Sequence, residues 1–360
     1  MKTLGPDEIA PLLDGHVDLR WRTESLQPLR LPVAELSFYD AFNRWVGSCA
    51  TACRLRLRTA STRLGLSGAQ RLLDQSVGGE RRGAYDLYVD GVLHARAWAQ
   101  GGATIALEKA AFVGDEAFNL TFAGLPVGDK TLELWLPQAA TVSIATLDLD
   151  DGAQAAPVAD GRPRVIFHGS SITHCLEAEG ASAGWPAVAA GLAGVDHQNL
   201  GWAGSCLLSG QAARIIRDAR ADAIVLKLGI NVHPDGQLKE RAFLDSAHAM
   251  ISIIREKHAA TPILVVSPIY SPGREDQGSG GGLPLTRMRQ LLVDVVAARL
   301  AAGDANIGYL DGLSLFGAAD ADLLPDDLHP NTEGYRLMGE RFHALAPRGP
   351  KALVRPPAAP

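Results

Sequence analysis

VIFHGSSIT, at residues 165–173, is the stretch from which the fold of this chain can be inferred. Its three leading apolar residues predict a buried strand, and Gly169 permits a sharp turn after that strand. Ser170 and Ser171 follow, and then a segment that could begin a helix. This arrangement holds a hydroxyl at a sheet edge, beside backbone N–H groups and the positive end of a helix dipole. Gly-Ser-Ser turns are common, so a reactive serine is predicted only if the chain supplies its partners.

The region after residue 164 alternates short apolar runs with candidate helices. Strands that alternate with helices predict a parallel sheet covered by helices on both faces. The predicted strands are residues 165–167, 196–200, 223–228, 263–266 and 307–310, and the predicted helices are residues 185–192, 210–220, 239–258, 285–302 and 332–345.

The first 160 residues have a different pattern, in which polar and apolar side chains alternate in short segments separated by glycine-containing turns. This pattern predicts an antiparallel β-sandwich, resembling a jelly roll, with few helices. A segment rich in Gly, Ala and Pro, residues 150–163, is typical of a linker. We therefore predict a β-sandwich accessory domain at 1–160, an α/β domain at 161–346 and a disordered proline-rich tail at 347–360. The predicted sandwich strands are residues 52–58, 85–89, 117–122, 131–136 and 141–149.

Composition narrows the function classes. The chain has 360 residues, 47% of them hydrophobic, and a net charge of −6. A negative net charge gives no indication of binding to nucleic acid or to an anionic membrane surface. No apolar run approaches the roughly 20 residues of a membrane span, and the first 15 residues lack the apolar core of a signal peptide. We expect neither nucleic acid nor membrane as a partner.

Four cysteines are too few for a disulfide framework and indicate a reducing compartment, so we predict a cytoplasmic protein. Cys49 and Cys53 have the spacing of a metal-ligand pair, but the sequence has no second pair to complete a zinc site. We therefore interpret them as free structural thiols and predict no metal.

Several side chains that could take part in a reaction follow the predicted strands. In an open parallel sheet, ligands bind beyond the carboxyl ends of the strands. Ser171 follows the first strand, a glycine-rich turn ending in Gly204 follows the second, and Asn231 follows the third. Asp326 and His329 lie close together near the C-terminus. A hydroxyl, an imidazole, a carboxylate and a carboxamide are the groups needed for acyl transfer through a serine ester.

Chemistry assigns a role to each of these groups. A serine hydroxyl becomes a good nucleophile only when a base such as His329 takes its proton. Asp326, three residues earlier, can accept the other N–H of that imidazole. The backbone N–H groups of Ser171 and Gly204 and the amide of Asn231 can stabilise the oxyanion, each by about 3 kcal/mol. The alternatives that remain open are Ser170 as nucleophile, Asp327 as the acid and Gly201 as the glycine donor.

The order of these blocks resembles that of the SGNH, or GDSL-type, hydrolases over about residues 164–346. The resemblance implies a flavodoxin-like α/β/α fold and a Ser–His–Asp triad without metal or cofactor. It implies Ser171 as nucleophile, although Ser170 stands where the family usually has Asp. Residues 83–88, GAYDLY, and residues 226–232, LKLGINV, are similar to a two-domain branch with an N-terminal sandwich carrying a GxDLY motif. That branch includes esterase-like proteins and an acyltransferase of polyketide tailoring.

Three functions follow from the sequence. The first is an esterase that forms an acyl-enzyme on Ser171 and hydrolyses it. The second is an acyltransferase that moves the acyl group, for example from acyl-CoA, to an alcohol of a natural product. The third is an inactive ligand-binding protein. The expected partners are a small acyl ester or thioester and an alcohol acceptor, and His233, Trp202 and Arg274 are candidate substrate-binding residues.

Overall fold

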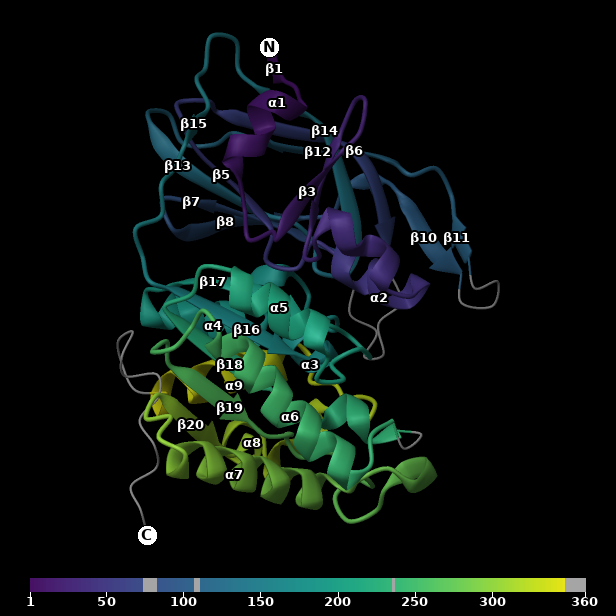
Figure 1. The fold of residues 1–360 in the computed structure, drawn as a ribbon. Helices are drawn as coiled ribbons and strands as arrows, with labels where there is room; N and C mark the ends of the chain where they lie inside the picture. Colours follow the sequence, from purple (N-terminus) through teal and green to yellow (C-terminus); the bar gives the residue numbers. More distant parts are fainter. Residues whose placement is uncertain (74–82, 107–110, 235–236, 347–360) are drawn as a thin grey trace. The chain divides into compact units, whose positions relative to one another are not determined.

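The computed structural model describes residues 1–73, 83–106, 111–234 and 237–346 (Figure 1). Contacts between Cα atoms group them into two compact units. Unit 1 holds Met1–Gly161 together with Leu176–Ser182, and unit 2 holds Arg162–Cys175 with the described residues from Ala183 onward. The domain bounds 1–160 and 161–346 stay a prediction, since contacts do not test independent folding. The predicted tail at 347–360 lies outside the described residues.

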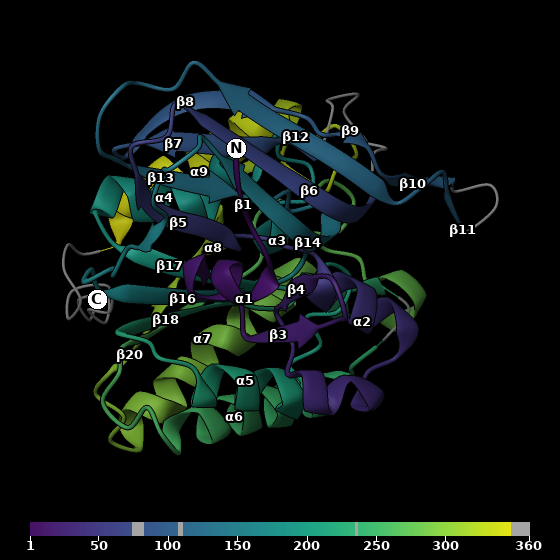
Figure 2. The same ribbon diagram turned by 90° about the horizontal axis from the view of Figure 1, so that it is seen from above.

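Unit 1 contains two β-sheets, as the alternating N-terminal pattern predicts. Figure 2 shows β5, β13, β7 and β8 side by side in one of them. That sheet has the order β15 (Ala156–Pro157), β5 (Arg54–Thr59), β13 (Lys130–Trp135), β7 (Tyr85–Val89) and β8 (Val92–Ala97), with β2 (Leu13–Asp14) beside β5. The other has the order β11 (Ala111–Val113), β10 (Ala103–Ala106), β6 (Arg63–Leu72), β14 (Ala140–Leu149), β4 (Leu26–Leu29) and β3 (Asp18–Trp21), with β1 (Lys2–Leu4), β12 (Ala117–Ala123) and β9 (Gln100–Gly101) attached.

Strand β12 shows why the alternation forms a sheet. Phe118, Leu120 and Phe122 are buried, and the residues between them are exposed. The sequence did not indicate β6, because glycines interrupt its pattern. At Gly68, φ is +157°, and a Cβ would lie 2.0 Å from the carbonyl oxygen of Ser143. The register between β6 and β14 shifts close by, so the glycine accommodates a β-bulge. Unit 1 also contains α1 (Pro6–Ile9) and α2 (Ala41–Ser48), which lie outside the predicted strands.

Unit 2 has a five-stranded parallel sheet between two helical layers, so the predicted α/β/α fold class is confirmed. In Figure 1, α5 and α6 lie on one face of this sheet. Helix α4 packs on α9, and α6 packs on both α5 and α7. The strands, in spatial order, are β17 (Asp196–Gly201), β16 (Arg164–Gly169), β18 (Ala223–Lys227), β19 (Ile263–Val266) and β20 (Ile307–Leu310); the helices include α4 (Trp185–Ala193), α5 (Gly210–Asp218), α6 (Glu240–Arg255), α7 (Leu285–Ala301), α8 (Gly312–Leu315) and α9 (Thr332–Leu345).

The strand order places the serine turn at a switch point. The chain runs from β16 to β17 on one side and then to β18 on the other side of β16. Connections leave in opposite directions there, which opens a crevice at the carboxyl ends of the strands. The turn after β16 carries Ser171. In the described part of the chain, the structure contains no helix with both the length and the apolar character needed to span a bilayer.

Candidate active site

Ser170 and Ser171 have different roles in the turn after β16. Ser171 is the first residue of α3 (Ser171–His174), and Ser170 is its N-cap. The Ser170 hydroxyl accepts a hydrogen bond from the backbone N–H of Ile172, at 3.2 Å. A Cβ at Gly169 would lie 2.3 Å from Oγ1 of Thr173, so this turn requires glycine. One serine therefore caps the helix, and the hydroxyl of the other is not used in the cap.

The Ser171 hydroxyl is the start of a chain of hydrogen bonds. Its Oγ lies 2.7 Å from Nε2 of His329, and Nδ1 of that ring lies 2.6 Å from Oδ2 of Asp326. A carboxylate can only accept, so the proton is on Nδ1 and Nε2 accepts from the serine. Residues separated by more than 150 positions in the sequence are thus joined in the order that acyl transfer needs.

Asp326 is ionised in this arrangement. Its partial burial raises the pKa, but the hydrogen bonds from the side chain and backbone of His329 outweigh burial and lower the pKa of Asp326 to about 2. The other candidate acid, Asp327, is exposed and has φ of +61°. Its carbonyl oxygen accepts from the Ser271 hydroxyl, at 2.5 Å, and from Arg274, at 3.0 Å. Of the two acids, Asp326 is therefore the one hydrogen-bonded to the imidazole.

Asn231 is oriented by one hydrogen bond. It lies in a 3₁₀ turn, Ile230–Val232, directly after β18, and Gly229 before it has φ of +118°. The Oδ1 atom of Asn231 accepts from the backbone N–H of Cys206, at 3.0 Å. Among the described residues, its Nδ2 group donates to no acceptor. The fixed oxygen therefore leaves the amide NH₂ available for an oxyanion.

The two candidate glycines after β17 differ in the use of their N–H groups. The N–H of Gly201 donates to Oδ1 of Asn199, at 2.8 Å. A Cβ at Gly201 would lie 2.3 Å from the backbone nitrogen of His174, so this glycine allows the strand end to pack on α3. Gly204 is exposed, with φ of +67°, and its N–H has no acceptor within the described chain. Gly204 is therefore the better placed of the two as a donor.

The three candidate substrate-binding residues contact protein groups. Trp202 is buried and packs edge-to-face on His168, with ring centroids 5.7 Å apart. His233 is buried, and its Nδ1 lies 3.1 Å from the carbonyl oxygen of Leu283. Arg274 donates to the carbonyl oxygen of Asp327, which precedes His329 by two residues. Substrate contact by these residues stays a prediction, and Arg274 additionally braces the loop that carries the imidazole.

Lys227 is a site neighbour that the sequence reasoning missed. Only 1% of it is exposed, at the end of β18 and paired in register with Gly169. Burial lowers the pKa of its ammonium group to about 8. No carboxylate in the described residues forms an ion pair with it. The sequence signal that could have indicated this burial is a lysine directly after the apolar residues AIVL of β18. The thiols of Cys175 and Cys206 are also buried, and burial raises the pKa of both.

No cluster of three or more His, Cys, Asp or Glu side chains suited to a metal ion occurs among the residues that the structure describes. All four cysteines are unpaired and buried. The candidate reactive groups of the site are therefore the side chains of Ser171, His329, Asp326 and Asn231 and the backbone N–H groups of Ser171 and Gly204.

Comparisons with known proteins identify the family of this chain. A model of the GDSL-like lipase/acylhydrolase family matches residues 167–337, the range that contains every element of the site. The structure of the salicylyl-acyltransferase SsfX3 from a tetracycline biosynthetic pathway is similar, with 30% sequence identity and a TM-score of 0.81; the match covers 94% of this chain and 95% of that chain. A search of curated protein sequences gives no match.

More distant structures share the fold. A putative GDSL-like lipase from Bacteroides ovatus has 16% identity and a TM-score of 0.72, covering 95% of each chain. A family two carbohydrate esterase from Cellvibrio japonicus has 13% identity and a TM-score of 0.61, covering 95% of this chain and 96% of that chain. The near full-length match to SsfX3 includes the N-terminal β-sandwich. This chain belongs to the GDSL-like lipase/acylhydrolase (SGNH) family of ester hydrolases and acyltransferases, in its two-domain form with an N-terminal β-sandwich.

Proposed function

We propose that this protein is a serine-dependent acyl-ester enzyme that carries its acyl group on Oγ of Ser171. The observation that supports this most directly is the chain of hydrogen bonds from Ser171 through His329 to Asp326, with lengths of 2.7 and 2.6 Å. Both lengths are short enough for proton transfer in a reactive complex. The alternative of an inactive binding protein gives no reason for this alignment of three groups.

In the first half of the reaction, Nε2 of His329 takes the proton of the Ser171 hydroxyl while Oγ attacks the ester carbonyl carbon. Asp326 holds the ring in place and stabilises the imidazolium that forms. The carbonyl oxygen becomes an oxyanion, for which the proposed donors are the N–H groups of Ser171 and Gly204 and the amide of Asn231. His329 then returns the proton to the leaving alcohol, and the acyl-enzyme remains.

In the second half, water attacks the acyl-enzyme with His329 again as the base. The products are the free acid and the regenerated Ser171 hydroxyl, so the proposed activity is that of an esterase acting on small acyl esters. A second candidate is transfer of the acyl group to an alcohol of a natural product, with an acyl thioester such as acyl-CoA as donor. The 30% identity to a salicylyl-acyltransferase over 94% of this chain favours keeping that candidate.

A partition experiment separates the candidates. The enzyme is acylated with a short p-nitrophenyl ester, and intact-protein mass spectrometry follows the acyl adduct. Products are then quantified with and without added alcohol acceptors. An esterase releases free acid at a rate that the alcohols do not change, whereas a transferase forms new esters at the expense of acid. Wild-type protein that forms no adduct and turns over no ester would contradict the proposed function altogether.

The remaining expectations concern partners and compartment. A small acyl ester or thioester is the proposed substrate, with no nucleic acid or membrane as partner. Four unpaired buried cysteines are compatible with the reducing cytoplasm, which we propose as the compartment.

A further inference from the structure

Unit 1 contains a cavity of 330 Å³ that the proposed chemistry does not use. It lies between the β3–β4 hairpin, helix α2 and strands β6 and β14. Its volume is in the range of small-molecule binding sites. The lining that bears on a ligand consists of Arg20, Arg22, Arg44, Arg71, Trp45 and Glu116.

The lining has an excess of positive charge. Four arginines and one glutamate line the cavity, so the lining carries a net charge of about +3. Glu116 forms its ion pair with Arg71, at 2.7 Å. Across the described residues, no carboxylate forms an ion pair with Arg20, Arg22 or Arg44. This concentration of positive charge occurs on a chain whose net charge is −6.

Arg20 and Arg22 repel each other. Arg20 lies in β3, Arg22 directly follows the last residue of that strand, and both line the cavity. Partial burial and the neighbouring charge of Arg22 both lower the pKa of Arg20. The guanidinium of Arg20 has only a long hydrogen bond, 3.4 Å, to Oε1 of Gln27. Repulsion between these like charges destabilises the protein when no ligand is bound, and a bound anion would reduce that repulsion.

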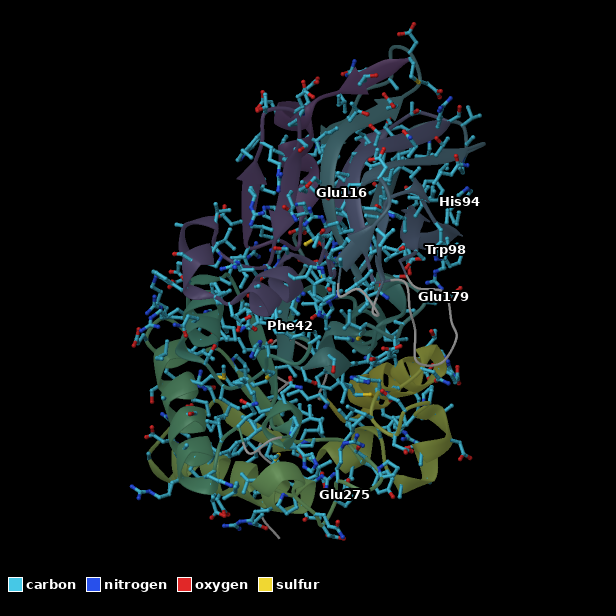
Figure 3. All side chains as sticks on the ribbon, turned by 90° about the vertical axis from the view of Figure 1, so that its right-hand side faces the viewer. Phe42, His94, Trp98, Glu116, Glu179 and Glu275 are labelled. Carbon is cyan, nitrogen blue, oxygen red and sulfur yellow. The ribbon has the colours of Figure 1, made fainter. Side chains whose placement is uncertain are left out.

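The cavity also has an aromatic wall. Trp45 lines it, and the ring of Phe42, one helical turn earlier on α2, lies 6.3 Å from the Trp45 ring. Phe42 is 54% exposed, and Figure 3 labels it together with Glu116. The indole N–H of Trp45 is buried and has no acceptor in the described structure. The hydroxyls of Thr141 and Ser143 complete a lining that suits a ligand with both a ring and an anionic group.

We propose that this cavity binds a small organic phosphate, with a phosphate monoester held by Arg20, Arg22 and Arg44 and a ring packed against Trp45. Guanidinium groups match phosphate oxygens with pairs of parallel hydrogen bonds. Three guanidinium groups favour a dianion over the single charge of a carboxylate. The site is separate from the residues of the proposed acyl transfer, none of which lines it.

Titration calorimetry on the full chain tests this with three probes: phenyl phosphate, inorganic phosphate and benzoate. Phenyl phosphate is expected to bind most tightly, because it supplies both the dianion and the ring. Its affinity should fall as salt is added. In the double variant Arg20→Gln/Arg22→Gln, affinity should fall about 100-fold, or about tenfold for each charge-assisted contact.

The matched control is Arg58→Gln/Arg63→Gln, which removes two exposed positive charges from unit 1 outside the cavity. It should change the affinity by less than about twofold. Ser171→Ala should bind phenyl phosphate as the wild type does. If the double variant does not fold, Arg44→Gln takes its place, with an expected loss of about tenfold.

Four results would overturn the proposal. These are a wild-type Kd weaker than about 1 mM for phenyl phosphate, equal weakening in the double variant and its control, loss of binding in Ser171→Ala, and tighter binding of benzoate than of phenyl phosphate. The last result would identify the cavity as a carboxylate site instead.

Discussion

The carboxylate of Asp86 holds Ser182 with two hydrogen bonds to the same oxygen, one from the hydroxyl at 2.5 Å and one from the backbone N–H at 3.2 Å. Asp86 is fully buried on β7, and its other oxygen accepts from Arg96 at 2.5 Å. Arg96 also pairs with Glu179, which is labelled in Figure 3. A Cβ at Gly180 would lie 2.5 Å from this carboxylate, so glycine allows the chain to approach it. The Asp of the GAYDLY motif thus anchors residues 176–182, which begin two residues after helix α3 ends.

Asp86→Asn is expected to lower the free energy of unfolding by about 3 kcal/mol, because the change breaks a pair whose carboxylate is fully buried and leaves Arg96 with Glu179 as its ionic partner. Urea unfolding measures the change, and amide exchange across residues 176–182 should become faster. Arg58→Gln breaks an exposed ion pair with Asp129 and is the control, with little change expected. An Asp86→Asn protein as stable as the control would show that the buried pair contributes nothing.

Ser171→Ala is expected to reduce ester turnover by at least about 10⁴-fold, because it removes the proposed nucleophile. Ser170→Ala should retain most of the activity and lose only about 1 kcal/mol of stability through the missing N-cap. Initial rates on a short p-nitrophenyl ester and thermal unfolding of both variants are the measurements. Full activity in Ser171→Ala would refute the mechanism, and equal losses in two folded variants would leave Ser170 as a candidate nucleophile.

Asn231→Asp is expected to lower kcat by about 10²–10³-fold with a small change in KM, because only the transition state carries the oxyanion. The new carboxylate can still accept from the N–H of Cys206, so the fold should be retained. Asn231→Ala should lose similar activity and also some stability, since that acceptor disappears. A large rise in KM with unchanged kcat would instead identify Asn231 as a residue of substrate binding.

Asp326 is expected to make stability depend on pH in acid. Its pKa is about 2 in the folded protein, against a usual value of 3.8. The ionised group therefore contributes about 2 kcal/mol above pH 4, and this contribution is lost as the pH falls from about 4 to 2. Unfolding of wild type and Asp326→Asn should be compared across this range. The difference in stability between them should shrink as the pH falls; a constant difference would contradict the prediction.

Lys227 is expected to make stability depend on pH in the same direction as Asp326, but at the alkaline end. Its folded pKa is about 8 and its usual value is 10.5, so the unfolded chain binds more protons between these values. The stability contribution of this group therefore rises as the pH rises through that window. Below pH 8 the buried charge costs about 3 kcal/mol, so Lys227→Met should be more stable than wild type at pH 7. The gain should vanish near pH 10.5. A less stable Lys227→Met at pH 7 would show that the ammonium has a favourable partner.

The elements of unit 2 could be predicted closely because their signals are local. The apolar run at Ile263–Val266 and the periodic segment at Thr332–Leu345 have the bounds expected from sequence. The strand β6 could not be predicted, because Gly65 and Gly68 break its alternation and only pairing with β14 explains them. The local sequence pattern also could not predict that Lys227 is buried, or that Arg274 hydrogen-bonds to the loop that carries His329.

The sequence by itself determined the hydrophobic period of each segment, and from it the type of each layer. It also determined that Ser171 and Asn231 closely follow strands and that His329 comes after them near the C-terminus. Such features depend on residues that are neighbours in the chain. Only the tertiary structure decided between Asp326 and Asp327, and between the two serines, as hydrogen-bonding partners of the imidazole. Those choices depend on backbone angles and on groups far apart in sequence, which become neighbours only when the sheet forms. The arginine cavity of unit 1 has the same origin, since its charges come from separate strands and one helix.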